Sequence, residues 1–148
     1  MRDVYTIGCF VCGVKRLTFK GGTQPAWGSK GLIAFARSGN VYTMDEGGKR
    51  LKRVTGKGGS QPNWSPHATK LAFTRKGNVY LVGSDGKRLK RLTGRGGSQP
   101  AWSPDGKKIV FVRGADVYSV ATDGSGLSKV ATAGTGTSLS HPDWQPTR

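Results

Sequence analysis

Four polar side chains occupy the same place in four similar segments of the sequence. Gln24, Gln61 and Gln99 each precede a proline, and His141 precedes Pro142 in the last segment. An amide side chain both donates and accepts hydrogen bonds, and so does a neutral imidazole ring. These groups are suited to bind an extended peptide backbone if the fold brings them together. The alternative is that each glutamine satisfies backbone groups in the Gly-Gly loop just before it.

Basic residues are the second chemical signal. The chain has 24 Lys and Arg against 8 Asp and Glu, so its net charge is +16. Many of them fall in the last predicted strand of each repeat or in the turns beside it. We call the following set the basic rim: Lys49, Arg50, Lys52, Arg53, Lys87, Arg88, Lys90 and Arg91. Lysines on a sheet edge discourage edge-to-edge aggregation, whereas a basic rim can also bind nucleic acid or an acidic polymer.

Cys9 and Cys12 are the two cysteines of the sequence. A single CxxC pair supplies two thiolates, whereas a structural zinc site takes four ligands. Two copies of the chain could combine their pairs, and a redox pair is a further option. Because other repeats place a hairpin turn here, the favoured interpretation is two small apolar residues at a turn, without a bound metal.

Motifs of the main enzyme classes are absent from the sequence. It contains no G-x-S-x-G, H-E-x-x-H or Walker loop. Two histidines and eight acids leave little material for acid–base catalysis. The apolar stretch at residues 4–14 is too short to span a bilayer. We therefore expect a protein with no catalytic activity, no cofactor and no membrane span.

The elements that position these residues follow from an internal repeat. Three independent markers recur about every 38 residues, which is a spacing typical of repeat architectures. The first marker is a tryptophan, at Trp27, Trp64, Trp102 and Trp144. The second is a Val-Tyr pair at residues 4–5, 41–42, 79–80 and 117–118. The third is Phe-x-Arg at residues 35–37, 73–75 and 111–113.

Each repeat predicts four short strands joined by turns. In residues 94–132 the strands are SQPAW, KKIVFVR, DVYSVA and LSKVAT, which are β-branched or alternate in polarity. Ser103-Pro104-Asp105-Gly106 has the composition of a tight turn. The proline of SQPAW is expected to hold the residue before it in an extended conformation. One such sheet cannot bury both of its faces alone, so the pattern predicts stacked β-propeller blades with Trp and Phe between them.

The pattern QPxWSPDGKKIVF…DVY…DG…LT resembles the WD40-like repeat of TolB-type propellers, often called the PD40 repeat. The resemblance covers nearly the whole chain, with departures in the turns at residues 28–30 and 67–68. It implies an all-β fold of four-stranded antiparallel blades, in a family whose members are often periplasmic or secreted. The first strand of each blade would line a central channel. The glutamines and His141 would then gather at one mouth of that channel.

The repeat also predicts how the chain is organised as a single propeller segment. The predicted units are an outer half-blade (3–18), three full blades (19–55, 56–93 and 94–132) and the inner strand of a next or split blade (133–148). We expect either a fragment of a larger propeller or a protomer whose ring is completed by self-association, with a homodimer as the concrete and favoured form.

The expected function is a non-catalytic scaffold that binds protein or peptide partners at the channel mouth or on the loop face. The first alternative is a binder of nucleic acid or another polyanion that uses the basic rim. The second is a fragment of a regulatory propeller from a peptidase resembling prolyl oligopeptidase.

Overall fold

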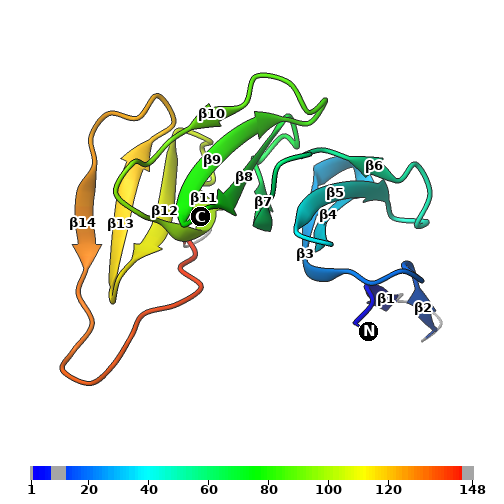
Figure 1. The fold of residues 1–148 in the computed structure, drawn as a ribbon, viewed down its shortest axis with the longest axis horizontal. Coiled ribbons are helices and arrows are strands. Elements are labelled where there is room, and N and C mark those ends of the chain that lie inside the picture. The colour runs from blue at the N-terminus through cyan, green and yellow to red at the C-terminus, as the bar shows by residue number, and fades with distance from the viewer. Residues whose placement is uncertain (1, 8–12, 145–148) are drawn as a thin grey trace.

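The computed structural model describes residues 2–7 and 13–144, whose regular secondary structure is antiparallel strands and a single 3-10 turn. Three four-stranded sheets and one two-stranded sheet follow one another along the chain. Figure 1 shows these sheets side by side in an arc. The predicted all-β fold with three four-stranded antiparallel blades is confirmed. No helix in the described residues is both long and apolar enough to span a membrane.

Every four-stranded sheet is made of four consecutive strands joined by hairpins. Blade 1 consists of β3 (Thr23–Gly28), β4 (Leu32–Arg37), β5 (Asn40–Asp45) and β6 (Lys52–Arg53), with a single 3-10 turn, η1 (Ser29–Gly31), after β3. Blade 2 consists of β7 (Ser60–Trp64), β8 (Lys70–Arg75), β9 (Asn78–Gly83) and β10 (Lys90–Arg91). Blade 3 consists of β11 (Ser98–Trp102), β12 (Lys108–Arg113), β13 (Asp116–Ala121) and β14 (Ser128–Ala131). The two-stranded blade consists of β1 (Tyr5–Ile7) and β2 (Val14–Arg16).

Residues 133–144 contain no assigned strand, and residues 145–148 lie outside the described part. The predicted division of the chain into blade units, the closure of a ring and the homodimer stay predictions.

The second and third strands of the three complete blades pair in one register. A phenylalanine lies opposite a tyrosine in each blade, as Phe73 lies opposite Tyr80 in blade 2. The two rings of each pair are stacked, with centroids 5.9, 5.9 and 6.0 Å apart in blades 1, 2 and 3. The three phenylalanines are fully buried. Cross-strand aromatic pairs stabilise a sheet, so this register forms the centre of each blade.

The apolar core lies between successive blades. Trp64 of blade 2 belongs to one cluster with Ala34 and Val41 of blade 1, and Trp102 of blade 3 packs in the same way against blade 2. These two indoles are 6% and 7% exposed, as predicted for tryptophan between blades. Trp27 differs, because it is 58% exposed. Among the described residues, the two-stranded blade has no counterpart of the strand whose alanine packs against Trp64 or Trp102.

A side-chain clamp joins the end of one blade to the start of the next. In blade 1 the hydroxyl of Thr55 accepts a hydrogen bond from the backbone N–H of Val41, 2.9 Å away. Asn40 Oδ1 accepts from the N–H of Gly58 at 3.1 Å. Thr55 is buried, and satisfying a buried strand N–H avoids a large desolvation cost. The same clamp recurs in blade 2 and in the two-stranded blade.

In the two-stranded blade the clamp residue is Asp3, where the next two blades have asparagine. Burial of this carboxylate acts to raise its pKa. Hydrogen bonds from Thr18, Arg16 and the N–H of Gly21 oppose that effect, and together they hold the pKa of Asp3 below its usual value. Arg16 also forms a salt bridge with Asp3.

Three aspartates in hairpin turns also have lowered pKa values. In each case the largest cause is a hydrogen-bond donor within two residues of the carboxylate. The donors are the backbone N–H of Lys87 for Asp85, the hydroxyl of Ser103 for Asp105 and the hydroxyl of Ser125 for Asp123.

The folded protein should lose stability as the pH falls below about 4. The four carboxylates have lower pKa values when folded than the ordinary value of 3.8, so the unfolded chain takes up protons first. Their contribution is complete above pH 3.8 and is lost as the pH falls through the folded values. Thermal unfolding followed by circular dichroism from pH 7 to pH 3 should show a falling Tm. Asp3→Asn should make that fall shallower, and an identical pH profile would contradict the role of Asp3.

Candidate binding site at the inner strands

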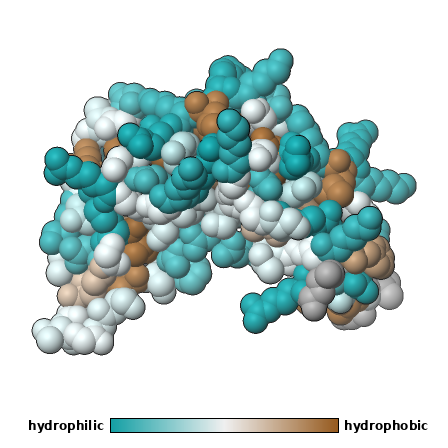
Figure 2. Space-filling view, in the orientation of Figure 1, coloured by the Kyte–Doolittle hydropathy of each residue, from teal (hydrophilic) through white to brown (hydrophobic). Residues whose placement is uncertain are grey.

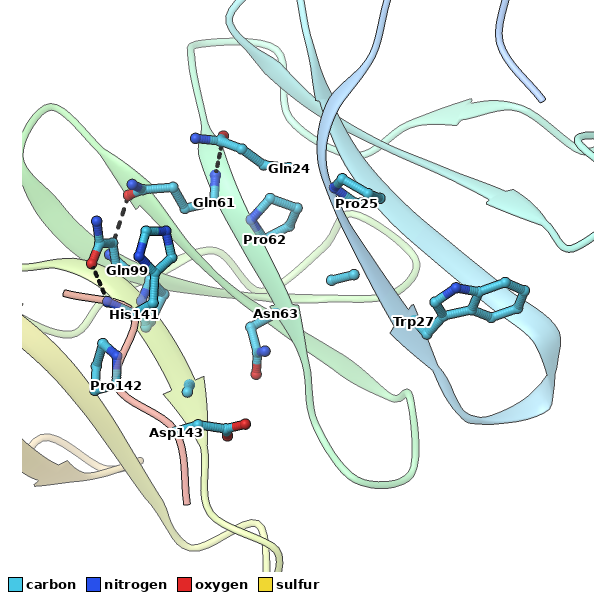
Figure 3. A pocket seen from close by; sticks show the side chains of 13 residues that line it. Gln24, Pro25, Trp27, Gln61, Pro62, Asn63, Gln99, His141, Pro142 and Asp143 are labelled. Atoms are coloured by element: carbon cyan, nitrogen blue, oxygen red, sulfur yellow. Dashed lines mark hydrogen bonds between the residues drawn. The ribbon is translucent and has the colours of Figure 1, made fainter. Parts of the chain in front are cut away.

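One pocket of about 400 Å3 lies where the inner strands of the three blades meet the C-terminal segment. It is lined by four equivalent segments, at residues 24–27, 61–63, 99–101 and 141–143. Figure 3 shows that the side chains of Gln24, Gln61, Gln99 and His141 follow one another along one side of it. The structure therefore brings together all four residues that the sequence singled out.

A ladder of hydrogen bonds runs through these four residues. The side-chain oxygen of Gln24 accepts from the backbone N–H of Gln61 at 2.9 Å. Gln61 accepts in the same way from Gln99 at 3.1 Å, and Gln99 accepts from His141 at 2.6 Å. Each amide oxygen thus satisfies the backbone of the next repeat. None of these bonds joins a glutamine to its own Gly-Gly loop, which was the alternative interpretation.

The ladder depends on an unusual backbone conformation. The φ angles of Gln24, Gln61, Gln99 and His141 are 54°, 51°, 52° and 49°, in the left-handed region. The expectation that the following proline keeps them extended is wrong. Each inner strand has an irregularity in its pairing at this point, between Ser60 and Asn63 in blade 2, for example. This bulge takes the glutamine out of its own sheet and allows it to bond with the neighbouring blade.

The ladder uses the oxygen of each amide and leaves its NH2 group as a donor. No acceptor for these NH2 groups is found within the described residues. Gln24 and His141 are exposed, and Gln61 and Gln99 are half-buried. The pocket therefore presents a row of amide donors with an imidazole at its end.

Two further residues of the pocket were not predicted. Asn63 stands where blades 1 and 3 have alanine, and its side-chain oxygen accepts from the N–H of Trp102 at 3.0 Å. A polar residue at an otherwise apolar position of the repeat was the signal available in the sequence. Trp27 is also among the lining residues, but Figure 3 shows its indole directed away from the ladder side chains, and it is exposed, whereas Trp64 and Trp102 are buried.

The basic rim lies at the other end of the blades, on and beside the outer strands β6 and β10 (Figure 1). All eight of its residues are exposed. Figure 2 shows hydrophilic side chains along this outer side. Two of the lysines also join blades, because Lys52 Nζ donates to the carbonyl of Asp85 at 2.9 Å and Lys90 Nζ to that of Asp123 at 2.7 Å.

Cys9 and Cys12 lie outside the described residues, so the interpretation of this pair stays a prediction. Within residues 2–7 and 13–144, no group of three or more His, Cys, Asp and Glu side chains is placed to hold a metal ion.

Removing one rung of the ladder should lower stability. Gln61→Ala leaves the N–H of Gln99 with only the hydroxyl of Thr74, which is 3.2 Å away. Gln61→Ala combined with Thr74→Val removes both acceptors and should cost about 1–3 kcal/mol in urea unfolding. Gln61→Glu keeps an oxygen acceptor and is the matched control, with little expected loss. If the native chain, the Gln61→Ala/Thr74→Val variant and the Gln61→Glu variant unfold at the same urea concentration, the ladder does not stabilise the fold.

No protein-family model matches the sequence, and no curated protein matches it. Solved structures match its fold. A protein assigned as TolB from Agrobacterium tumefaciens superposes with a TM-score of 0.68 and 22% identity, over 78% of this chain and 51% of that chain. TolB from Acinetobacter baumannii gives 0.71 and 23%, over 88% and 38%. An oligogalacturonate lyase in complex with manganese gives 0.72 and 14%, over 90% and 43%.

The chain thus spans about half or less of the length of these structures. At these identities the likeness shows the fold. The sequence resemblance to TolB-type propellers is confirmed at that level, and the chain has the blade fold of the TolB propellers.

Proposed function

We propose that this protein is a non-catalytic β-propeller scaffold that binds an extended segment of a protein or peptide in the pocket at its inner strands. The observation that carries the proposal is the glutamine ladder. Its backbone bonds hold each amide in place, and each amide keeps an NH2 group for a ligand. A row of donors that repeats from blade to blade complements the carbonyl groups of an extended chain.

Backbone strain at the same positions supports this proposal. Four non-glycine residues in succession around the pocket have φ near 50°. Each such conformation costs on the order of 1–3 kcal/mol. Six non-glycine residues outside the pocket also have positive φ, so the support comes from the recurrence of the conformation at all four ladder residues. The rings of Pro25, Pro62 and Pro142 add apolar contact surface to the same pocket. A few oriented polar groups on an apolar lining are typical of ligand-binding sites.

The lining of the pocket supports binding in preference to catalysis. Among its lining residues are one carboxylate, Asp143, and one imidazole, His141, with no serine, threonine or cysteine. Covalent catalysis needs a nucleophile beside a base. The solved structures that share the fold include TolB and a lyase, so the fold itself does not decide between the two classes.

Gln61→Glu together with Gln99→Glu should remove peptide binding and leave the fold intact. Glutamate keeps the oxygen that accepts from the next blade, but it replaces the NH2 donor with a negative charge. An array of random decapeptides should yield sequences that bind the native chain with micromolar affinity and lose at least tenfold with the double variant, measured by fluorescence anisotropy. Peptides that bind both proteins equally well would contradict a role for these amides.

A second candidate function is polyanion binding through the basic rim. The observation that favours it is a row of exposed lysines and arginines on the outer strands of a chain with net charge +16. Charges of one sign along an edge attract a nucleic acid backbone without sequence preference.

Binding of a 20-base-pair DNA duplex should be steeply dependent on salt if this second function is correct. Affinity should fall about 10³-fold or more between 50 and 200 mM salt if six or more phosphates are contacted. Replacing Lys49, Arg50, Lys87 and Arg88 by glutamate should abolish binding. The same charge change at Lys70, Lys76, Lys107 and Lys108, which are exposed away from the outer strands, should reduce it far less. Weak binding that does not change with salt would reject the rim as a polyanion site.

A further inference from the structure

A cavity of about 310 Å3 lies between the two-stranded blade and blade 1. We call it the junction crevice. One side is formed by residues 17–20, which follow β2, and the other by Arg37, Met44, Gly48 and Leu51 of blade 1. None of these residues lines the pocket that holds the glutamine ladder. The crevice is therefore separate from the site of the proposed function.

The same crevice recurs between blades 2 and 3. There a cavity of about 100 Å3 is lined by residues 92–95, which follow β10, and by Arg113, Val120, Gly124 and Leu127. Each of these residues occupies the same position of the repeat as its counterpart in the junction crevice. The crevice is therefore a feature of the contact between successive blades, and both of its sides belong to the described residues.

Apolar side chains at two depths line the junction crevice. Leu17 and Met44 are buried in the core between the two blades. Leu51 is 50% exposed and Phe19 is 70% exposed. The next two junctions have glycine at the position of Phe19, so its ring is specific to this crevice. An apolar group bound here would rest on the two buried side chains and cover the two exposed ones.

Two cations line the crevice, and none of its lining residues is acidic. Arg37 Nε donates to the carbonyl of Gly21 at 2.9 Å, and its guanidinium lies 5.3 and 5.4 Å from the ring centres of Phe35 and Tyr42. These contacts hold the arginine in place. Neither Arg37 nor Lys20 forms a salt bridge within residues 2–7 and 13–144. The pair therefore provides an oriented positive charge for an anion.

The polar side chains of the lining favour a carboxylate over a protein segment. The hydroxyl of Thr18 is already used, because it accepts from the N–H of Val4 at 2.9 Å and donates to Asp3 at 3.0 Å. Lys20 and Arg37 are donors only. The N–H groups of a peptide backbone would find no free acceptor among these side chains, whereas a carboxylate needs donors alone.

We infer that the junction crevice binds a medium-chain aliphatic carboxylate. The carboxylate is held by Lys20 and Arg37, and the alkyl chain lies against Phe19 and Leu51. The volume is at the lower end of the range of about 300–1,000 Å3 that is usual for ligand pockets, so it suits a short chain. The net charge of +16 attracts such an anion. The other two junctions lack the phenylalanine, so one molecule binds per chain.

Isothermal titration calorimetry of the full chain with carboxylates of different length tests the inference. Octanoate should bind with one-to-one stoichiometry and at least tenfold more tightly than butanoate, because each buried methylene raises affinity about fourfold. Octanamide, which lacks the charge, should bind at least fivefold more weakly than octanoate. A smaller effect of chain length, octanamide binding as tight as that of octanoate, or no saturable binding of octanoate would overturn the inference.

Protein variants locate the bound octanoate. Phe19→Gly introduces the residue of the other two junctions and should weaken binding at least fivefold, and so should Lys20→Gln. Lys20→Arg keeps the charge, as Arg95 does between blades 2 and 3, and should bind like the native chain. Lys70→Gln changes an exposed lysine outside the crevice and is the matched control. Circular dichroism verifies that all four variants stay folded.

Two further results separate this site from other interpretations. The double variant Gln61→Glu and Gln99→Glu should still bind octanoate, because neither residue lines the crevice. Octanoate binding that neither Phe19→Gly nor Lys20→Gln weakens would overturn the assignment to the junction crevice. An acidic peptide containing leucine that binds there while octanoate does not would assign the crevice to a protein segment and also overturn the inference.

Discussion

A single four-stranded sheet of this protein has two apolar faces, and each must be covered by a neighbouring blade. Trp64 and Trp102 provide the contact, because each indole lies against a fully buried alanine of the blade before it. The clamps formed by a buried threonine and an asparagine or aspartate then fix the connection between blades. Trp27 has no such alanine beside it among the described residues, and its side chain is exposed.

The candidate site depends on this stacking. The glutamine ladder crosses from one blade to the next, so its spacing is set by how closely the inner strands approach. The oxygen of each glutamine accepts a hydrogen bond from the neighbouring blade, and under the proposed function its NH2 group would bind the ligand. A substitution to alanine would then affect both the fold and the proposed binding. A glutamate separates the two roles because it keeps the acceptor and removes the donor.

The strands and turns could be predicted from the sequence because their signals are local. Alternating and β-branched segments between Gly- and Pro-containing turns predicted the four strands of each blade, whereas the cross-strand pairing of Phe with Tyr was seen only in the structure. The four ladder residues were also found, since they occupy one position of the repeat.

What could not be predicted depends on contacts between distant residues. The preference of Gln61 before a proline is for an extended backbone, but the bond to Gln24 of the preceding blade and the bulge in β7 override it. The exposure of Trp27 depends on which strands lie beside it, and no local pattern distinguishes it from Trp64. Asn63 gave a local signal, but its bond to Trp102 spans two blades.

The ladder also bears on how such a chain can lengthen. Gln61 and Gln99 each accept from the backbone of the unit after them and donate to the glutamine of the unit before them, so the three bonds between units are of the same kind. A tandem duplication of the gene segment for one unit would insert a new rung whose two ends already fit their neighbours. No compensating substitution would be needed at either junction, and the number of units could change in evolution by whole steps.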